Sequence, residues 1–266
     1  MKIRSSIGRF VATSCAGLAL TAPAPVVFAT QVVALEEVIV TARKRDERLQ
    51  DVSMSVTAIS AAEIEKRGIA DLADIARLDA SLVFDKGYSA TDNRIQIRGL
   101  SPSRGRVTVA VLVDGIDVSS ESIAFAGGSL LASTRLMDLQ AVEIAKGPQS
   151  ALYGRSAFAG AVQYVTKDPS REPEGSVRGS LGEYGRQDVS ASLSGPINET
   201  LGLRFNAGYW NQDGVYRNRI TGAKVGDGDG WGAALTAKWE PSDAVDVKAR
   251  LEVSNDRYGQ DPVASL

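Results

Sequence analysis

The sequence predicts an α+β domain followed by antiparallel transmembrane β-strands that belong to an incomplete β-barrel. Three observations lead to this fold class. The chain opens with the pattern of an export signal. Residues 45–168 combine two short helical patterns with several short apolar strands. Residues 175–266 alternate apolar and polar side chains in runs of about 9–11 residues, the length of a tilted strand that crosses a bilayer.

Residues 1–29 are expected to be a signal peptide that exports the chain from the cytoplasm. Three basic residues precede the short apolar run FVATSCAGLAL, which is too short to span a bilayer as a helix. Small residues then offer cleavage after Ala29 or, as an alternative, after Ala34. No later stretch is long and apolar enough for a membrane helix, so insertion into a membrane requires strands.

The composition argues against an enzyme and against a metal or cofactor site. The chain has no histidine, and its only cysteine is Cys15, within the expected signal peptide. The commonest general base, the commonest metal ligand and a thiol nucleophile are therefore missing from the mature chain. The formal net charge is −2, which gives no reason to expect a nucleic-acid partner.

Residues 45–168 predict a small mixed sheet with two helices. Ser60, with Glu63 three residues later, is typical of a helix start, and Gly68 is typical of the end of that helix. Asp71 is expected to begin a second helix over residues 72–78. The predicted strands are residues 52–60, 81–84, 94–98, 107–113, 142–146 and 161–166.

The stretch KGPQSALYGRSAFAGAVQYVTK (146–167) is punctuated by Gly147, Gly154 and Gly160. Their spacing fits neither a phosphate-binding loop nor a dinucleotide fingerprint. We expect these glycines to allow turns with positive φ and a close approach of neighbouring backbone.

Residues 175–266 predict five strands with one apolar and one polar face, at 175–182, 187–195, 201–210, 231–239 and 245–253. A secreted β-sandwich also alternates in this way. The strand length favours a membrane barrel, and so does the change between tight turns and one long polar connection over residues 211–230. Trp210, Trp231 and Trp239 lie at strand ends, where an aromatic girdle is expected. Bacterial barrels begin at eight strands, so we expect a longer protein.

Four segments, taken in order, resemble the TonB-dependent outer-membrane receptors. They are EEVIVTARKR (36–45), RIQIRGL (94–100), VAVLVDGI (109–116) and VEIAKGPQSALYGRSAFAGAVQYVTK (142–167). The resemblance covers nearly the whole mature chain. It implies a TonB box and the start of a linker at residues 36–44, a plug domain at residues 45–168, and the first barrel strands after it.

The resemblance also implies roles for two sets of residues. The TonB box is Glu37, Val38, Ile39, Val40, Thr41 and Ala42, which would recruit periplasmic TonB. Arg98–Gly99 and Lys146–Gly147–Pro148 would lock the plug to glutamates of the barrel. Lysine stands at 146 where the family has arginine, and it lacks the bidentate fork of arginine. The alternative is that Arg98 and Lys146 are ordinary surface charges.

The segment VIVT has physical properties that suit its implied role. It is β-prone and uncharged, so it can stay extended and add as a strand to the sheet edge of a partner. The alternative interpretation is an ordinary first strand of the plug domain.

Two functions of different classes follow. The first is a receptor for energised uptake of a scarce nutrient, such as a ferric siderophore, in contact with outer-membrane lipid. Arg104 and Arg106 are candidate contacts for an anionic ligand, with solvated loop arginines as the plain alternative. The second function is a secreted or surface β-rich binding module without transport activity.

Overall fold

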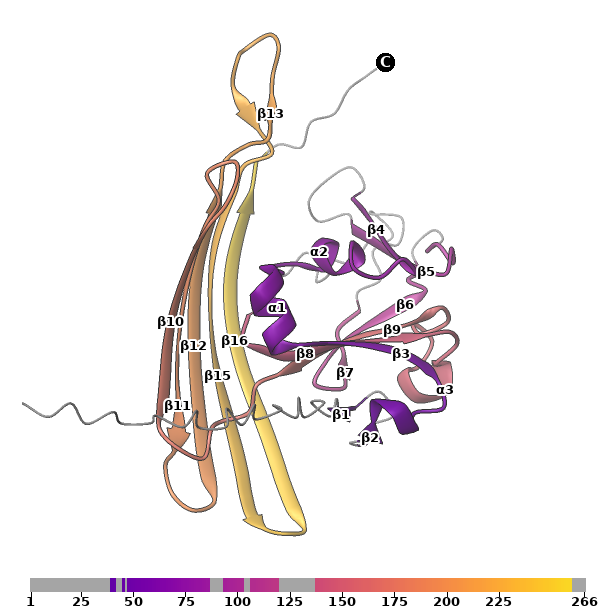
Figure 1. Ribbon diagram of the computed structural model, residues 1–266, viewed down its shortest axis with the longest axis vertical. Coiled ribbons are helices and arrows are strands. Elements are labelled where there is room, and N and C mark those ends of the chain that lie inside the picture. Colours follow the sequence, from indigo (N-terminus) through magenta and orange to yellow (C-terminus); the bar gives the residue numbers. More distant parts are fainter. Residues whose placement is uncertain are drawn as a thin grey trace, which may run out of the picture. The chain divides into compact units, whose positions relative to one another are not determined.

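The computed structural model of the chain (Figure 1) describes residues 39–41, 45, 47–86, 93–102, 106–119 and 137–259. Residues 39–168 hold an α+β domain, and residues 174–258 hold one antiparallel sheet. The predicted fold class is therefore confirmed. In the described part of the chain, no helix has the length and apolar character needed to cross a membrane.

The α+β domain is built on a mixed sheet of five strands. In spatial order these are β3 (Ser55–Ser60), β8 (Leu139–Lys146), β9 (Gly160–Thr166), β6 (Val109–Val113) and β7 (Ile116–Asp117). β6 and β9 are parallel, and the other neighbours are antiparallel. The alternate residues of β8 and β9 point to two faces, so the sheet separates two apolar clusters.

Helices α1 (Ala61–Arg67) and α2 (Leu72–Ala76) pack on one face of the central sheet, and both begin as the sequence predicts. The Ser60 hydroxyl accepts the Glu63 amide N–H at 3.4 Å, and the Asp71 carboxylate accepts the Asp74 amide N–H at 2.9 Å. Gly68 ends α1 with φ of +64°. Leu72 and Ile75 of α2 are buried in the same cluster as Val142, Ile144 and Val162 of the sheet.

Several short elements were not predicted. These are β2 (Glu47–Arg48), the 3-10 helix η1 (Leu49–Asp51), β7, α3 (Ser150–Tyr153), β13 (Tyr216–Arg217) and β14 (Lys224–Val225). The strand β1 (Ile39–Val40) lies within the segment VIVT, for which a first strand of the domain was the alternative interpretation. β4 (Leu82–Lys86) and β5 (Asn93–Ile97) were predicted as strands and pair as a separate antiparallel sheet. Two- to four-residue elements have too few residues to show a period, so sequence patterns do not find them.

Gly160 shows why the glycine-rich stretch needs glycine. Its φ is +152°, and a side-chain carbon at this position would lie 2.4 Å from the carbonyl oxygen of Ala145. Such a contact is impossible without movement of the β8 backbone. Gly147 and Gly154 also have positive φ, so the expected use of these glycines is confirmed.

The second sheet contains five long antiparallel strands that run side by side in Figure 1. They are β10 (Glu174–Leu181), β11 (Gln187–Pro196), β12 (Leu201–Gln212), β15 (Gly228–Ser242) and β16 (Val245–Tyr258). All five were predicted. β15 and β16, with 15 and 14 residues, are longer than expected. The long connection between β12 and β15 contains the small β13–β14 pair.

This sheet is apolar on its exposed face and polar on its covered face. Phe205 is 45% exposed, whereas its neighbours Arg204 and Asn206 are each only 4% exposed. Leu193, Phe205, Leu235 and Leu251 stand opposite one another across four strands and are all exposed. A water-soluble sheet places these side chains the other way round, whereas a membrane-crossing sheet has this pattern.

Two of the three tryptophans mark the edges of the apolar band on the exposed face of this sheet, and the third corrects the prediction. Trp231 and Trp239 lie on the exposed face and are eight residues apart in β15. Eight residues rise about 27 Å, which a tilt of about 40° reduces to about 20 Å, near the height of a membrane barrel's apolar band. Trp210 is not part of this girdle. It is buried on the polar face, where its indole N–H donates to Asp256 at 2.8 Å.

Candidate functional site

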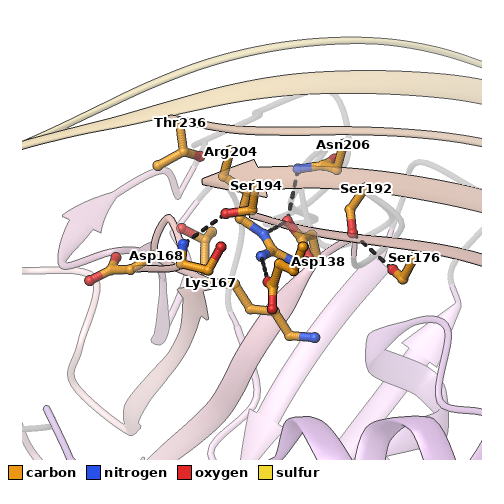
Figure 2. Close-up of polar contacts among 12 residues, drawn as sticks. Asp138, Lys167, Asp168, Ser176, Ser192, Ser194, Arg204, Asn206 and Thr236 are labelled. Atoms are coloured by element: carbon orange, nitrogen blue, oxygen red, sulfur yellow. Dashed lines mark hydrogen bonds and ion pairs between the residues drawn. The ribbon is translucent and has the colours of Figure 1, made fainter. Parts of the chain in front are cut away.

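A carboxylate immediately before β8 joins the α+β domain to the second sheet. Asp138 accepts two hydrogen bonds from the guanidinium of Arg204 on β12, at 2.6 and 2.7 Å (Figure 2). Asn206 donates a third at 3.1 Å, and Arg204 also reaches Glu174 of β10 at 2.8 Å. The side chains of Asp138 and Arg204 are both over nine-tenths buried. Two parallel hydrogen bonds between a guanidinium and a carboxylate fix the orientation of the two groups in addition to pairing their charges.

A second carboxylate, two residues after the end of β9, makes a similar junction. Asp168 contacts the ammonium groups of Lys238 on β15 at 2.8 Å and Lys248 on β16 at 2.9 Å. Lys248 also donates to the carbonyl of Thr166 at 3.0 Å and lies 3.3 Å from Asp114. Burial alone would raise the pKa of Asp168, but the hydrogen bonds from the two lysines outweigh it and lower that pKa.

Together these contacts form what we call the seam, defined by Asp138, Arg204, Asp168, Lys238 and Lys248. β8 and β9 are antiparallel, and Leu139 pairs with Thr166, so both seam carboxylates lie at one end of this strand pair. The seam therefore fixes that end of the central sheet to three strands of the second sheet. Removing one partner of the Asp138–Arg204 pair would leave a buried charge without its counter-charge, which is strongly destabilising.

The seam was not predicted from the sequence. Its signal is present in the sequence, because Arg204, Lys238 and Lys248 are charges on the polar face of strands whose other face is apolar. Long-range pairing with Asp138 and Asp168 depends on how the two sheets meet, and alternation within single strands does not encode that.

A cavity of about 260 Å³ lies between α1 and strands β10–β12. Charged side chains line it, including Glu65, Lys167 and Arg178. Arg178 donates to Glu65 at 2.7 Å, and this hydrogen bond lowers the pKa of Glu65. The cavity is smaller than the roughly 300–1,000 Å³ of pockets for drug-sized ligands, so we do not assign the nutrient to it.

The residues predicted to lock the plug lie close to one another. The Arg98 guanidinium is 3.8 Å from the point where a side chain at Gly147 would begin, and Arg98 and Gly99 both have positive φ. Pro148 directly follows Gly147 at the end of β8. Lys146 pairs with Asp79 of the same domain at 2.8 Å, and both side chains are largely buried. The contact of Arg98 or Lys146 with barrel glutamates stays a prediction.

Asp79 is held in its charged form by this environment. Burial alone would raise its pKa, but hydrogen bonds from Lys146, Ser81 and Thr57 outweigh burial and lower the pKa to about 2. Ser81 donates through its amide at 2.9 Å and through its hydroxyl at 2.7 Å. Asp79 therefore ties the loop before β4 to the end of β8.

Part of the predicted TonB box is described, and it forms a strand outside the central sheet. Ile39 and Val40 pair antiparallel with Arg48 and Glu47, and Val40 is buried. Thr41 contacts the central sheet through Glu143 and Gln163. Glu37, Val38 and Ala42 lie outside the described residues.

The structure describes one of the two candidate ligand contacts. Arg106 is exposed, near the start of β6. Arg104 lies outside the described residues. The sequence offered only the positive charge of these loops as a signal, and their role stays a prediction.

Comparison with protein families gives a match over residues 48–161 to the TonB-dependent Receptor Plug Domain. The chain is similar to the pesticin receptor of Yersinia pestis, with 30% identity over 61% of this chain and 23% of that protein. It is also similar to the vitamin B12 transporter BtuB of Vibrio vulnificus, with 26% identity over 80% of this chain and 33% of that protein.

Among solved structures, the ferric yersiniabactin uptake receptor FyuA of Yersinia pestis matches with a TM-score of 0.64 and 26% identity. The match covers 76% of this chain and 31% of FyuA. The chain thus spans about a quarter to a third of the length of these relatives. The relatives are receptors and transporters by name, which supports the expectation that the chain is not an enzyme.

Proposed function

The chain belongs to the TonB-dependent outer-membrane receptors, and from this premise we propose that the complete protein takes up a scarce nutrient across the outer membrane. The nutrient class is a ferric siderophore or a similar chelate. Periplasmic TonB supplies the energy by pulling on residues 37–42, which rearranges the plug domain. In this proposal residues 1–29 are the signal peptide, 36–44 the TonB box and linker start, 45–168 the plug, and 175–266 the first barrel strands.

The observation that carries the proposal is the placement of Ile39–Thr41. This segment is extended and β-prone, and its main-chain pairing in the structure is with the two-residue strand β2. A pairing this short is easily exchanged for a longer one at the sheet edge of a partner. The same chain also carries a folded domain and a sheet whose exposed face is apolar and whose covered face is polar. These are the two other parts that such a receptor needs.

Further roles within the proposal follow the family resemblance. Arg98–Gly99 and Lys146–Gly147–Pro148 lock the plug to barrel glutamates, and Arg104 and Arg106 contact the nutrient from loops of the plug. The ion pair of Lys146 with Asp79 means that Lys146 would contribute to this lock partly by fixing the end of β8.

The second candidate is a secreted or surface binding module without transport. The exposed band of Leu193, Phe205, Leu235 and Leu251 favours the membrane receptor, because a secreted sheet would expose this apolar surface to water. The two candidates differ in whether the protein remains in outer membranes after urea extraction.

The test of coupling compares two substitutions of Ile39 in the complete receptor. Proline removes a backbone donor and prevents regular strand pairing. Alanine keeps the backbone donor and still allows strand pairing. We expect Ile39→Pro to abolish energised uptake of a labelled ferric siderophore while its binding at the cell surface stays within about twofold of wild type. Ile39→Ala should retain most uptake, because main-chain bonds supply most of the affinity. Normal uptake by the proline variant would refute the assignment of Glu37–Ala42.

A further inference from the structure

Two glycines stand directly across from each other on the polar face of the second sheet. Gly208 of β12 pairs with Gly232 of β15. On either side of them, Ser190 of β11 pairs with Gly208, and Ser254 of β16 pairs with Gly232. We call this row of four small residues across four strands the notch.

The side chain of Met137, the residue just before Asp138, lies in the notch. A side-chain carbon at Gly232 would lie 2.5 Å from the methyl carbon of Met137, and one at Gly208 would lie 3.3 Å from its sulfur. Alanine therefore cannot replace Gly232 unless Met137 moves. Glycine inside a strand is destabilising relative to alanine, so two paired glycines here need a compensating contact, and Met137 provides it.

The backbone before β8 is bent in a way that brings two consecutive side chains to the second sheet. In a regular strand, neighbouring side chains point to opposite faces. Asp138 instead has a φ of +55°, which is uncommon for a residue other than glycine. As a result Met137 contacts the notch while Asp138 holds Arg204 of the same sheet (Figure 2).

The notch restricts the position of the domain more tightly than ion pairs do. Lys248 and Arg250 stand two residues apart on one face of β16, so a carboxylate displaced by that step still meets a cation. The notch has no such second position on β12. The buried side chains of Asn206 and Trp210 lie on the same face, two residues to either side of the glycine, and a displaced Met137 would collide with them.

We propose that Met137 is a positioning residue, which sits in the notch and fixes the α+β domain at one position along β12 and β15. The ion pairs of the seam supply strength, and Met137 selects the position. The inference goes beyond the proposed function and needs neither the nutrient nor TonB, because this chain carries both surfaces. The alternative is that the glycines only bend their strands, in which case the effect of alanine does not depend on residue 137.

The first test is a double-substitution cycle on the full chain in phospholipid vesicles, with the ratio of folded to unfolded protein taken from urea titrations. We expect Gly232→Ala to lower this ratio by about tenfold. Combined with Met137→Ala, the same change should instead raise the ratio, by up to about fivefold, because alanine is the better strand residue. Gly179→Ala on β10 is the control, since a side chain there meets nothing within 4 Å, and it should act alike with either residue at 137.

An equal effect of Gly232→Ala in both backgrounds would overturn the proposal, because the glycines would then serve their strands alone. If Gly232→Ala fails to insert into vesicles, Gly208→Ala gives the same comparison with a milder clash. Its effect should also reverse in sign when Met137 is replaced by alanine.

The second test measures the position of the domain directly. Arg178 and Ser180 lie two residues apart on one face of β10, and Glu65 of α1 contacts Arg178 at 2.7 Å. Glu65→Cys is combined with Arg178→Cys in one protein and with Ser180→Cys in another, both carrying Cys15→Ser to remove the native thiol. A short bismaleimide then links each pair, and the ratio of the two yields reports the position.

We expect Met137→Ala to lower the ratio of the 65–178 yield to the 65–180 yield by about fivefold, because the domain no longer has one preferred position. Met137→Leu has a similar volume and should keep the ratio within about twofold of the parent protein. An unchanged ratio in Met137→Ala would overturn the positioning role, since Met137 would then contribute packing alone.

Discussion

The α+β domain and the five-stranded sheet place the same kinds of residue in opposite directions. In the domain, Val142 and Ile144 of β8 are fully buried against helices. In the sheet, Phe205 is exposed and the adjacent Arg204 is buried. Alternation reports that a strand has two faces, whereas the surroundings decide which face is covered. The domain therefore buries its apolar side chains away from water. The sheet instead directs its apolar face outward, toward lipid, and its polar face toward the interior.

The buried ion pair that joins the two regions gives the largest expected effect. Replacing Arg204 with methionine leaves the carboxylate of Asp138 buried and unpaired. We expect Arg204→Met to lower the free energy of unfolding by about 3–5 kcal/mol in urea titrations. The control is Lys224→Met, which removes an exposed pair with Asp213 and should cost at most about 1 kcal/mol.

A double substitution sharpens this prediction. Asp138→Asn together with Arg204→Met should cost clearly less than the sum of the two single changes, because no buried charge then remains unpaired; Glu174, which also loses Arg204, is 57% exposed. Equal costs for Arg204→Met and Lys224→Met would show that the seam carries no special stability.

The second prediction breaks the comparison on the apolar face. Leu235 lies midway between Trp231 and Trp239 on β15, so it marks the middle of the apolar band. Arginine there should destabilise the protein inserted in phospholipid vesicles by about 2–4 kcal/mol. The control is Ile220→Arg, in the connection between β13 and β14, where the side chain is 96% exposed. If both variants insert and unfold alike, the exposed face does not meet lipid.

The smallest effect concerns acid stability of the α+β domain. The folded pKa of Asp79, about 2, lies below its ordinary value of 3.8, so its contribution is complete above about pH 4. The contribution is lost as pH falls from about 4 to about 2, and it amounts to about 2 kcal/mol. Unfolding free energies measured across this range should therefore fall more steeply for wild type than for Asp79→Asn. Parallel pH profiles would contradict the assigned ion pair with Lys146.

Regular elements could be predicted from the sequence because their signals are local. Ser60, Gly68 and Asp71 act through hydrogen bonds and dihedral angles within a few residues, and all three predictions are confirmed. The five long strands also carry their period within each run. The second helix ends at Ala76, two residues before the predicted residue 78, which is within the one or two residues by which helix boundaries vary because helix ends fray.

The contacts of the site could not be predicted in the same way. Asp138 and Arg204 are 66 residues apart, and Thr41 and Glu143 are 102 apart, so no local pattern joins them. Trp210 shows the same limit on a smaller scale. Its position at a strand end suited the girdle, but its face of the strand is set by register with Asp188 and Gly230.

The chain between β1 and the central sheet limits how far from the domain a partner bound to Val40 can lie. Val40 is separated from Ser55, where the first strand of the central sheet begins, by fifteen peptide units. A fully extended chain of this length spans about 50 Å. If β1, β2 and η1 unfold, a partner that holds Val40 can lie at any distance up to that limit without pulling on the central sheet. At greater distances the force acts on β3. This strand lies at the edge of the sheet and, among the described strands, is hydrogen-bonded only to β8.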